Sequence, residues 1–375
     1  MGKTIVLIGP VHPFRGGIAQ HTGRLAHALE QAGHRVEIIT FRALYPHWLY
    51  PGKSQFSPED SSPPVPIPTR ALLTPYLPWT WELARQEVLA LRPALVLFQW
   101  WTPFWAAAAA YLARQFRRAG LPVVFLVHNA LPHEPGPLDR WLSKLALRVA
   151  SGYIIHAESE RKRLEELLPG KRLIESCPHP LFDWQPSTLS KPEARCAWNL
   201  PAKAVVLLFF GFVRPYKGLD VLLDALGQLR QRRASLPYLV VAGEFWKDAR
   251  LYSQQIERLG LTGHVRLENG YIPDRRAADL FQAADLFVAP YRSATQSGAV
   301  KLAMSFGLPL LVTEPAVDEL VQSWPAVKIV PAGDAAVLAD ALQDWLDSLP
   351  TRLPRPDSAP GWAALVSCIE KFLPE

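Results

Sequence analysis

The chain contains little sulfur, with three cysteines and two methionines among its 375 residues. The cysteines are far apart in the sequence, at Cys177, Cys196 and Cys368, and no CxxC pair occurs. This spacing argues against a disulfide framework and against a zinc site built from paired cysteines, and it fits a protein of the reducing cytoplasm. The P-loop pattern GxxxxGK[ST], which binds phosphate in many nucleotide-binding proteins, is also missing.

We expect neither a signal peptide nor a membrane span. The first residues run directly into an apolar strand, Thr4 to Ile8, which leaves no room for the apolar region and cleavage site of a signal peptide. The uncharged run from Pro93 to Ala113 is long enough to cross a bilayer. Its prolines and the polar residues Gln99 and Thr102 instead predict a strand, a loop and then a helix.

The composition predicts a folded protein of two domains. Hydrophobic residues make up 49% of the chain and charged residues 20%, and 375 residues are many for one compact core. The net charge of +6 comes with basic clusters, such as residues 161–163, and with many aromatic residues in the N-terminal half. No nucleic-acid-binding motif accompanies them. An anionic membrane surface is therefore the preferred extended partner, with ordinary solvated helix faces as the alternative.

The apolar runs predict an α/β fold with two doubly wound, Rossmann-like domains. Strands and helices alternate over residues 4–175 and again over residues 204–348. We place the domains at residues 1–180 and 181–360, with the proline-rich stretch 178–201 as a linker. Residues 41–78 contain several aromatic residues and many prolines, and are predicted to be either an acceptor-capturing loop or a disordered excursion.

One loop of the second domain has the composition of a phosphate site. An apolar strand, Ala204 to Phe210, ends at Gly211, and the following turn presents Arg214 and Lys217 before an amphipathic helix. Ligands of open α/β sheets bind beyond the carboxyl ends of the strands, where two cations beside a helix N-terminus suit a phosphate or diphosphate. An ordinary solvated basic turn is the alternative.

A second loop of the same domain has related properties. The buried strand Asp285 to Tyr291 leads through residues 292–298 into an apolar helix. Ser297 offers a capping hydroxyl, and Gly298 allows the backbone to approach a ligand closely, so this helix N-terminus is a candidate anion site. The alternative is that Ser297 only caps its own helix.

These loops belong to a series of motifs that runs along nearly the whole chain. The motifs are GPVHPFRGGIAQHTGRLAHALEQAGHRVEIIT from Gly9, VHNALPHE from Val127, CPHPLFD from Cys177, FFGFVRPYKGLDVLL from Phe209, VVAGEF from Val240, NGYIPD from Asn269, AADLFVAPY from Ala283 and ATQSGAVKLAMSFGLP from Ala294. Together, and in this order, they resemble the GT-B glycosyltransferases of the family 4 type. The resemblance implies a retaining, nucleotide-sugar-dependent enzyme whose two domains face each other across a cleft. It also implies that a C-terminal helix within 361–375 packs back on the first domain.

The resemblance further implies roles for individual residues. His128, Arg214 and Lys217 would be catalytic, while His133 and Glu134 would orient the acceptor. The remaining residues would bind the donor, and they are Gly16, Gly17, Gly243, Glu244, Tyr271, Ile272, Ser297 and Gly298. Plainer roles remain open for three of these positions: a structural histidine at His128, an exposed polar loop at 133–134 and a solvated loop acid at Glu244.

Two departures from the family pattern concern the donor. Many members carry two glutamates eight residues apart, which contact the transferred sugar and the nucleotide ribose; here those positions fall near Ala294 and Leu302. The arginine of the usual G-R-L start is replaced by Phe212, and Arg214 lies two residues later. The sugar preference of the family therefore cannot be transferred to this chain, although Glu244 is a candidate replacement for the missing acids.

The expected activity is transfer of a sugar from a nucleoside-diphosphate sugar to a glycolipid or a growing polysaccharide. No cofactor or metal is expected, because Arg214, Lys217 and the helix N-terminus at Ser297 can neutralise the leaving diphosphate. The missing acidic pair keeps open a non-catalytic GT-B protein that binds nucleotide sugar or glycan. A nucleotide-sugar epimerase on the same fold is a weaker third possibility.

Overall fold

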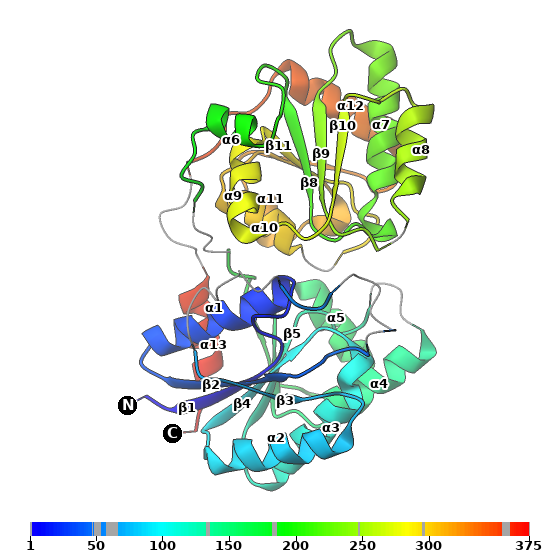
Figure 1. Cartoon of the computed structure of the whole chain (residues 1–375). Coiled ribbons are helices and arrows are strands. Elements are labelled where there is room, and N and C mark those ends of the chain that lie inside the picture. The colour runs from blue at the N-terminus through cyan, green and yellow to red at the C-terminus, as the bar shows by residue number, and fades with distance from the viewer. Residues whose placement is uncertain are drawn as a thin grey trace. The chain divides into compact units, whose positions relative to one another are not determined.

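The structure is a computed structural model that describes residues 2–46, 48, 54–57, 67–132, 136–181, 186–246, 248–294, 297–354 and 361–374. The chain divides into two compact units (Figure 1). The first unit comprises Met1–Pro180 together with Gly361–Glu375, and the second comprises Leu181–Pro360. Each unit contains one parallel β-sheet with helices on both faces, so each can be described by itself.

The sheet of the first unit has seven strands in the order β3-β2-β1-β4-β5-β6-β7. These strands are β1 (Thr4–Ile8), β2 (Arg35–Phe41), β3 (Thr69–Leu73), β4 (Leu95–Trp100), β5 (Val123–Val127), β6 (Gly152–Ile155) and β7 (Ile174–Ser176). The helices are α1 (Gly17–Gln31), α2 (Pro78–Ala90), α3 (Ala106–Arg118), α4 (Pro137–Leu147), α5 (Glu158–Leu167) and α13 (Trp362–Glu370).

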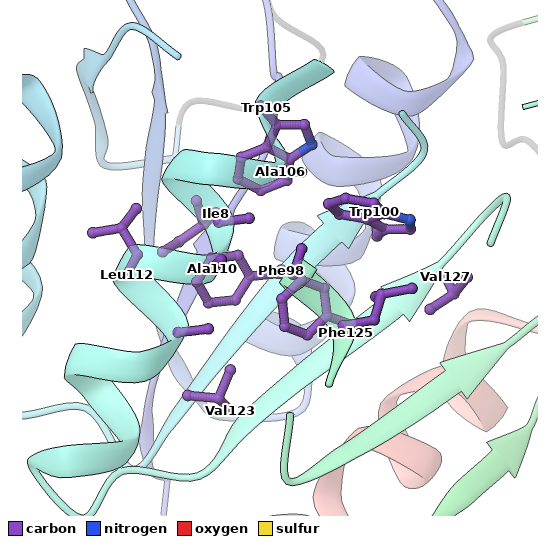
Figure 2. Packing of buried hydrophobic residues seen from close by; sticks show 14 of the residues in the cluster. Ile8, Phe98, Trp100, Trp105, Ala106, Ala110, Leu112, Val123, Phe125 and Val127 are labelled. Atoms are coloured by element: carbon purple, nitrogen blue, oxygen red, sulfur yellow. The ribbon is translucent and has the colours of Figure 1, made fainter. Parts of the chain in front are cut away.

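Two hydrophobic cores lie on the two faces of this sheet because successive side chains of a strand point to opposite sides. In β1, Val6 and Ile8 belong to the core that includes α2 and α3. The alternate residues Ile5 and Leu7 belong to the core of α1 and α13. Figure 2 shows the first core, where the Phe98 ring stacks on the rings of Phe125 and Trp105 with centroid distances of 4.8 and 5.9 Å. Both faces of the strands are therefore apolar, as is typical of a parallel sheet.

Helix α13 is part of the first unit although it comes from the end of the chain. Leu365 and Ile369 are fully buried in the same core as Leu25 of α1. Phe372, just beyond α13, packs against Gly152, where a Cβ atom would lie 2.2 Å from the phenylalanine ring. The glycine at the start of β6 thus provides the room that the C-terminal segment needs.

The sheet of the second unit has six strands in the order β10-β9-β8-β11-β12-β13. These strands are β8 (Val206–Phe210), β9 (Tyr238–Gly243), β10 (Val265–Asn269), β11 (Leu286–Ala289), β12 (Leu310–Thr313) and β13 (Val327–Val330). Helices α6 (Lys191–Ala197), α9 (Asp274–Ala283) and α10 (Gly298–Ser305) contribute to one core, and α7 (Leu219–Arg232), α8 (Arg250–Arg258) and α12 (Ala335–Asp347) to the other. A short helix, α11 (Glu319–Gln322), lies between β12 and β13.

Three elements correct the sequence-based picture. The segment 41–78 is not one long loop, since β3 pairs in parallel with β2 inside it. The stretch 178–201 is not only a linker, because it contains α6, whose N-terminus is closed by Ser190 and Glu193 in a capping box. The edge strand β13 was also missed, because its sequence VKIV contains a lysine and only its last residue is buried.

The uncharged run that begins at Pro93 folds as β4, the single turn Pro103–Trp105 and α3. No helix in the described part of the chain is long and apolar enough to cross a membrane.

Candidate functional site

The candidate site of the second unit lies between β8 and β11, where the strand order reverses. Strands β9 and β10 extend the sheet on one side of β8, and β12 and β13 extend it on the far side of β11. The loops that leave the carboxyl ends of two such strands diverge and open a crevice, the usual ligand position of open α/β sheets. Here those loops carry Arg214 and Lys217 after β8, and Ser297 after β11.

The two loops are fixed against each other. The guanidinium group of Arg292 donates hydrogen bonds to both carboxylate oxygens of Asp220, at 2.7 and 2.5 Å, and its backbone N–H donates to the Tyr216 carbonyl. Gly218 has a φ of 68°, and a Cβ atom there would lie 2.0 Å from the Pro290 carbonyl oxygen. Only glycine tolerates both conditions, so the turn that carries the basic residues has a defined position.

Lys217 is the central cation of this crevice. Its side chain is 8% exposed, and its ammonium nitrogen lies 5.2 Å from the centre of the Tyr291 ring. A Cβ atom at Gly211 would be 3.2 Å from this nitrogen and 4.0 Å from the Cβ of Ala299, which places Lys217 close to the start of α10. The alternative of a solvated basic turn is therefore wrong for this lysine.

No carboxylate among the described residues pairs with Lys217, and burial lowers the pKa of its ammonium group. The second unit contains an instructive contrast in Lys301 of α10, which is 1% exposed and forms an ion pair with Asp318 at 2.5 Å. A buried charge is costly unless it is paired. Lys217 thus has the environment of a cation whose counter-ion is an anionic ligand.

Helix α10 begins beside this lysine. Gly298 is its first residue, and the Ser297 hydroxyl accepts a hydrogen bond from the Val300 N–H at 3.3 Å, so Ser297 does cap its own helix. The same hydroxyl lies 3.1 Å from the hydroxyl of Tyr291, whose ring contacts Lys217. The cap and the cation therefore belong to one site, and a helix N-terminus adds a positive dipole end to it.

Arg214 is held by an aromatic residue that the sequence analysis did not single out. Its guanidinium carbon lies 3.4 Å from the centre of the Trp246 indole, and the ring of Phe212 packs against the same indole at 5.3 Å. The backbone N–H of Trp246 donates to the Val213 carbonyl at 3.1 Å, which ties the loop after β9 to the loop after β8. This stacked arrangement limits how far the guanidinium group can move.

The other predicted donor residues occupy the same edge of the sheet. Glu244 directly follows β9 and is only 5% exposed, so it is not a solvated loop acid. Gly243 has a φ of 148°, and a Cβ atom there would lie 2.0 Å from the Gly211 carbonyl oxygen, which gives this glycine a packing role. Tyr271 and Ile272 follow β10 and are partly buried.

In the first unit, His128 directly follows β5 and is 5% exposed. Its Nε2 atom lies 2.6 Å from the Oε1 atom of Gln99, a fully buried residue of β4. The rings of His21, His156 and His179 complete a cluster in which the recorded centroid distances are 4.8 to 5.4 Å. Burial, followed by the neighbouring imidazoles, lowers the pKa values of His21 and His128 well below the ordinary range.

Gly16 and Gly17 mark the start of α1, on which His21 lies. Gly16 has a φ of 106°, which disfavours other residues, and Gly17 has open space around its Cβ position. The predicted acceptor residues His133 and Glu134 lie outside the described residues. In the part of the chain that the structure describes, no group of three or more histidine, cysteine, aspartate or glutamate side chains could hold a metal ion.

Two family models match the chain. The model for Glycosyltransferase Family 4 matches residues 15–175, and the model for Glycosyl transferases group 1 matches residues 204–348. The chain belongs to the GT-B glycosyltransferases of the family 4 type. The predicted family and the predicted GT-B fold class are thereby confirmed.

Similar proteins include glycosyltransferases from bacteria and plants. A GDP-mannose:glycolipid 4-beta-D-mannosyltransferase of Xanthomonas campestris pv. campestris is 28% identical over 67% of this chain and 67% of its own length. A phosphatidyl-myo-inositol mannosyltransferase of Mycobacterium leprae is 33% identical over 38% of this chain and 37% of its own length. The catalytic domain of starch synthase IV from Arabidopsis thaliana, bound to ADP and acarbose, superposes with a TM-score of 0.71 at 14% identity, covering 99% of both chains.

The sequence analysis identified His128 of this glycosyltransferase but missed the other members of its cluster, which are His21, His156 and His179. His128, His156 and His179 each follow one of three consecutive strands, β5, β6 and β7. Histidines in this repeated position were a usable signal, because the carboxyl ends of parallel strands lie at one edge of the sheet. No comparable signal in the sequence identified Tyr291, Trp246 or Gln99. Their importance comes from their contacts with Lys217, Arg214 and His128, respectively.

Proposed function

We propose that this glycosyltransferase moves a sugar from a nucleoside-diphosphate sugar to a lipid-linked or polysaccharide acceptor, without a metal and with retention of the anomeric configuration. The observation that carries the proposal is the buried ammonium group of Lys217, which has no carboxylate partner among the described residues and lies at the point where the strand order reverses. A diphosphate would supply the missing negative charge.

The chemistry follows from the charge that develops during transfer. Breaking the bond between the sugar and the phosphate leaves negative charge on the departing nucleoside diphosphate. Lys217 and the N-terminal end of α10 are positioned to stabilise this charge, and Arg214 adds a second cation from the same turn. Such prearranged groups act most strongly where water is excluded, and a buried lysine satisfies that condition.

A leucine replaces the second glutamate of the family's acidic pair in this chain. Leu302 is 4% exposed and is packed into the core beneath α10, so no carboxylate occupies the place of the second family glutamate. We assign the sugar or ribose contact to Glu244. This residue follows β9, which is the neighbour of β8, the strand that leads into the turn of Lys217. A Glu244→Gln variant that binds the donor and transfers the sugar normally would remove this assignment.

The names of the relatives direct the choice of substrates. Both curated relatives described above are named mannosyltransferases, one for GDP-mannose and a glycolipid and one for phosphatidyl-myo-inositol. GDP-mannose with a lipid-linked acceptor is therefore the first pair to test. The name of the Xanthomonas relative specifies a β-linkage, whereas nucleoside-diphosphate mannose is α-linked. The anomer of the product must therefore be measured, and a β-linked product would contradict retention.

The experiment compares UDP-, GDP- and ADP-sugars by thermal shift and then measures transfer to a lipid extract. A donor at 100 times its Kd stabilises the fold by roughly 2.7 kcal/mol. We expect the sugar donors of one nucleotide to stabilise the protein, and we expect sugar transfer from such a donor to continue in the presence of EDTA. A metal requirement would contradict the proposed charge stabilisation, and binding without turnover of any acceptor would favour the non-catalytic GT-B protein.

A further inference from the structure

We propose that Gln99 is a positioning residue that fixes the proton of His128 on Nε2, within a cluster of imidazoles that keeps His128 neutral. The Nδ1 atom of His128 is then a hydrogen-bond acceptor for a substrate hydroxyl. The statement that His128 meets a substrate rests on the proposed function, whereas the tautomer and the charge of His128 can be measured without it.

The contact between the two side chains determines which nitrogen carries the proton. The Oε1 atom of Gln99 lies 2.6 Å from Nε2 of His128, and an amide oxygen can only accept a hydrogen bond. With the Gln99 amide in this orientation, which leaves its own Nε2 atom buried without a hydrogen-bond partner in the described part of the chain, we infer that Nε2 of His128 donates and that Nδ1 carries no proton in the neutral ring. Nδ1 has no hydrogen-bond partner among the described residues, and His128 is 5% exposed.

The position of Gln99 is itself built into the sheet. Gln99 is fully buried in β4, which pairs directly with β1. Just after β1, a Cβ atom at Gly9 would lie 2.7 and 2.8 Å from the Cγ and Cβ atoms of Gln99. The absence of a side chain at Gly9 thus leaves room for the Gln99 side chain. A larger residue at position 9 would displace the Gln99 amide from His128.

The surroundings of His128 disfavour its protonation. His21 of α1 is 1% exposed, and its ring lies edge-on to His128 at 4.8 Å. His156 and His179 lie on the same cluster, and their Nδ1 atoms bond to the carbonyls of Cys177 and Pro180 at 2.8 and 2.7 Å. A proton on His128 would therefore enter a buried group of rings rather than water.

The other titratable groups near the cluster do not supply a free negative charge. Burial raises the pKa of the Cys177 thiol to about 12, so this thiol is neutral. Glu160 of α5 accepts a hydrogen bond from the Ala130 N–H, two residues beyond His128, at 2.5 Å and forms an ion pair with Arg163 at 2.8 Å. Trp362 of α13 contacts His21 and carries no charge.

The test measures the imidazole nitrogens of the full-length protein by long-range ¹H–¹⁵N NMR, with His128→Gln to assign the signal. In the unmodified protein we expect His128 to be neutral at pH 6, with the proton on Nε2. Gln99→Met should leave both tautomers populated, and Gln99→Glu should make His128 titrate at a higher pH. Thr40→Val, at another buried polar residue of the same sheet, is the matched control and should change neither property.

Kinetics supply the functional arm. We expect Gln99→Met to lower kcat about 10- to 100-fold with little change in the donor KM, by analogy with the partners that orient ligand histidines. A proton on Nδ1, or a His128 that titrates near its ordinary value in the unmodified protein, overturns the inference. If no acceptor is ever turned over, the proposed function fails, and the NMR measurement still decides the inference about Gln99.

Discussion

At the scale of single residues, two buried lysines of the second unit have different surroundings. Lys301 is paired with Asp318, so its charge is satisfied within the protein. Lys217 is nearly as well buried and has no such partner among the described residues, which makes it unfavourable in the absence of an anion. Their burial is similar, and the presence or absence of a carboxylate partner distinguishes Lys301 from Lys217, the residue that we propose binds the diphosphate.

Lys217→Met removes the charge and keeps most of the side-chain volume. We expect kcat to fall by about 10²–10³ and nucleotide-induced thermal stabilisation to disappear, because a contact that strengthens as the diphosphate leaves acts mainly in the transition state. The melting temperature without ligand should stay constant or rise, since an unpaired buried charge has been removed. Normal turnover in this variant would place the diphosphate elsewhere.

Lys301→Met is the matched control for this experiment. It leaves Asp318 without its partner, so we expect a loss of about 3–5 kcal/mol in the free energy of unfolding. The two substitutions are identical in chemistry and should therefore differ in sign for stability.

Trp246→Leu tests the residue that stacks on Arg214. Cation–π contacts contribute about 0.5–2 kcal/mol, which corresponds to roughly a 2- to 30-fold effect. We expect kcat/KM for the donor to fall within this range, while Trp246→Phe, which retains an aromatic face, should lose less. Equal kinetics for both variants and the unmodified protein would show that Arg214 needs no support from this ring.

At the scale of elements, the histidine cluster joins four separate parts of the first unit. His21 belongs to α1, and the other three histidines follow β5, β6 and β7. These segments are far apart in the sequence, yet α1 packs on the sheet and the three strands are neighbours in it. The cluster therefore forms only when α1 is packed on this edge of the sheet.

The cluster should make the first unit sensitive to acid. His21 and His128 have pKa values lowered by burial, so the unfolded chain binds their protons more readily than the folded unit does. Stability should therefore be fully present above the unfolded pKa of about 6.5 and should decline as the pH falls below it. Two such groups give a slope of up to roughly 2.7 kcal/mol per pH unit.

Urea unfolding at pH 7.5, 6.5 and 5.5 measures this dependence. His128→Gln removes one of the two groups, so its unfolding free energy should vary less steeply with pH. An unchanged unfolding free energy between pH 6.5 and 5.5 in the unmodified protein would contradict the burial of neutral imidazoles.

At the scale of the whole molecule, the surface of the first unit carries an amphipathic helix. Leu138 and Trp141 of α4 are 65% and 61% exposed, and Lys144 and Arg148 are exposed on the same segment. Aromatic and basic side chains together favour the headgroup region of an anionic bilayer. A lipid-linked acceptor would be reached from such a surface.

We predict that the protein floats with anionic liposomes at low salt and less well at high salt, because surface electrostatics are screened. Leu138→Ser together with Trp141→Ser should abolish flotation. The matched control is Trp79→Ser with Leu83→Ser on α2, where a tryptophan and a leucine are also exposed, at 63% and 46%. Equal loss in both double variants would show that exposed apolar area alone, and no particular helix, drives binding.

The α/β class of both units followed from the sequence, because apolar runs of strand length that alternate with amphipathic helices leave few arrangements other than a covered parallel sheet. The glycine and the basic residues after β8 were recognisable from the sequence as a candidate phosphate site, because ligands of such sheets bind at the loops that follow the strands. Strand β3 was missed because only one of its five residues is buried, and helix α6 because it is short and lies among prolines. β3 pairs with β2, and α6 packs on α9.

The properties that decide the candidate site belong to the tertiary structure. Burial of Lys217, the stacking of Trp246 on Arg214 and the bond between Gln99 and His128 each join residues from different strands or loops. The sequence determined which side chains are available at the ends of the strands. The order of the strands determined which of them meet, because desolvation and contact depend on neighbours in space that lie far apart in the sequence.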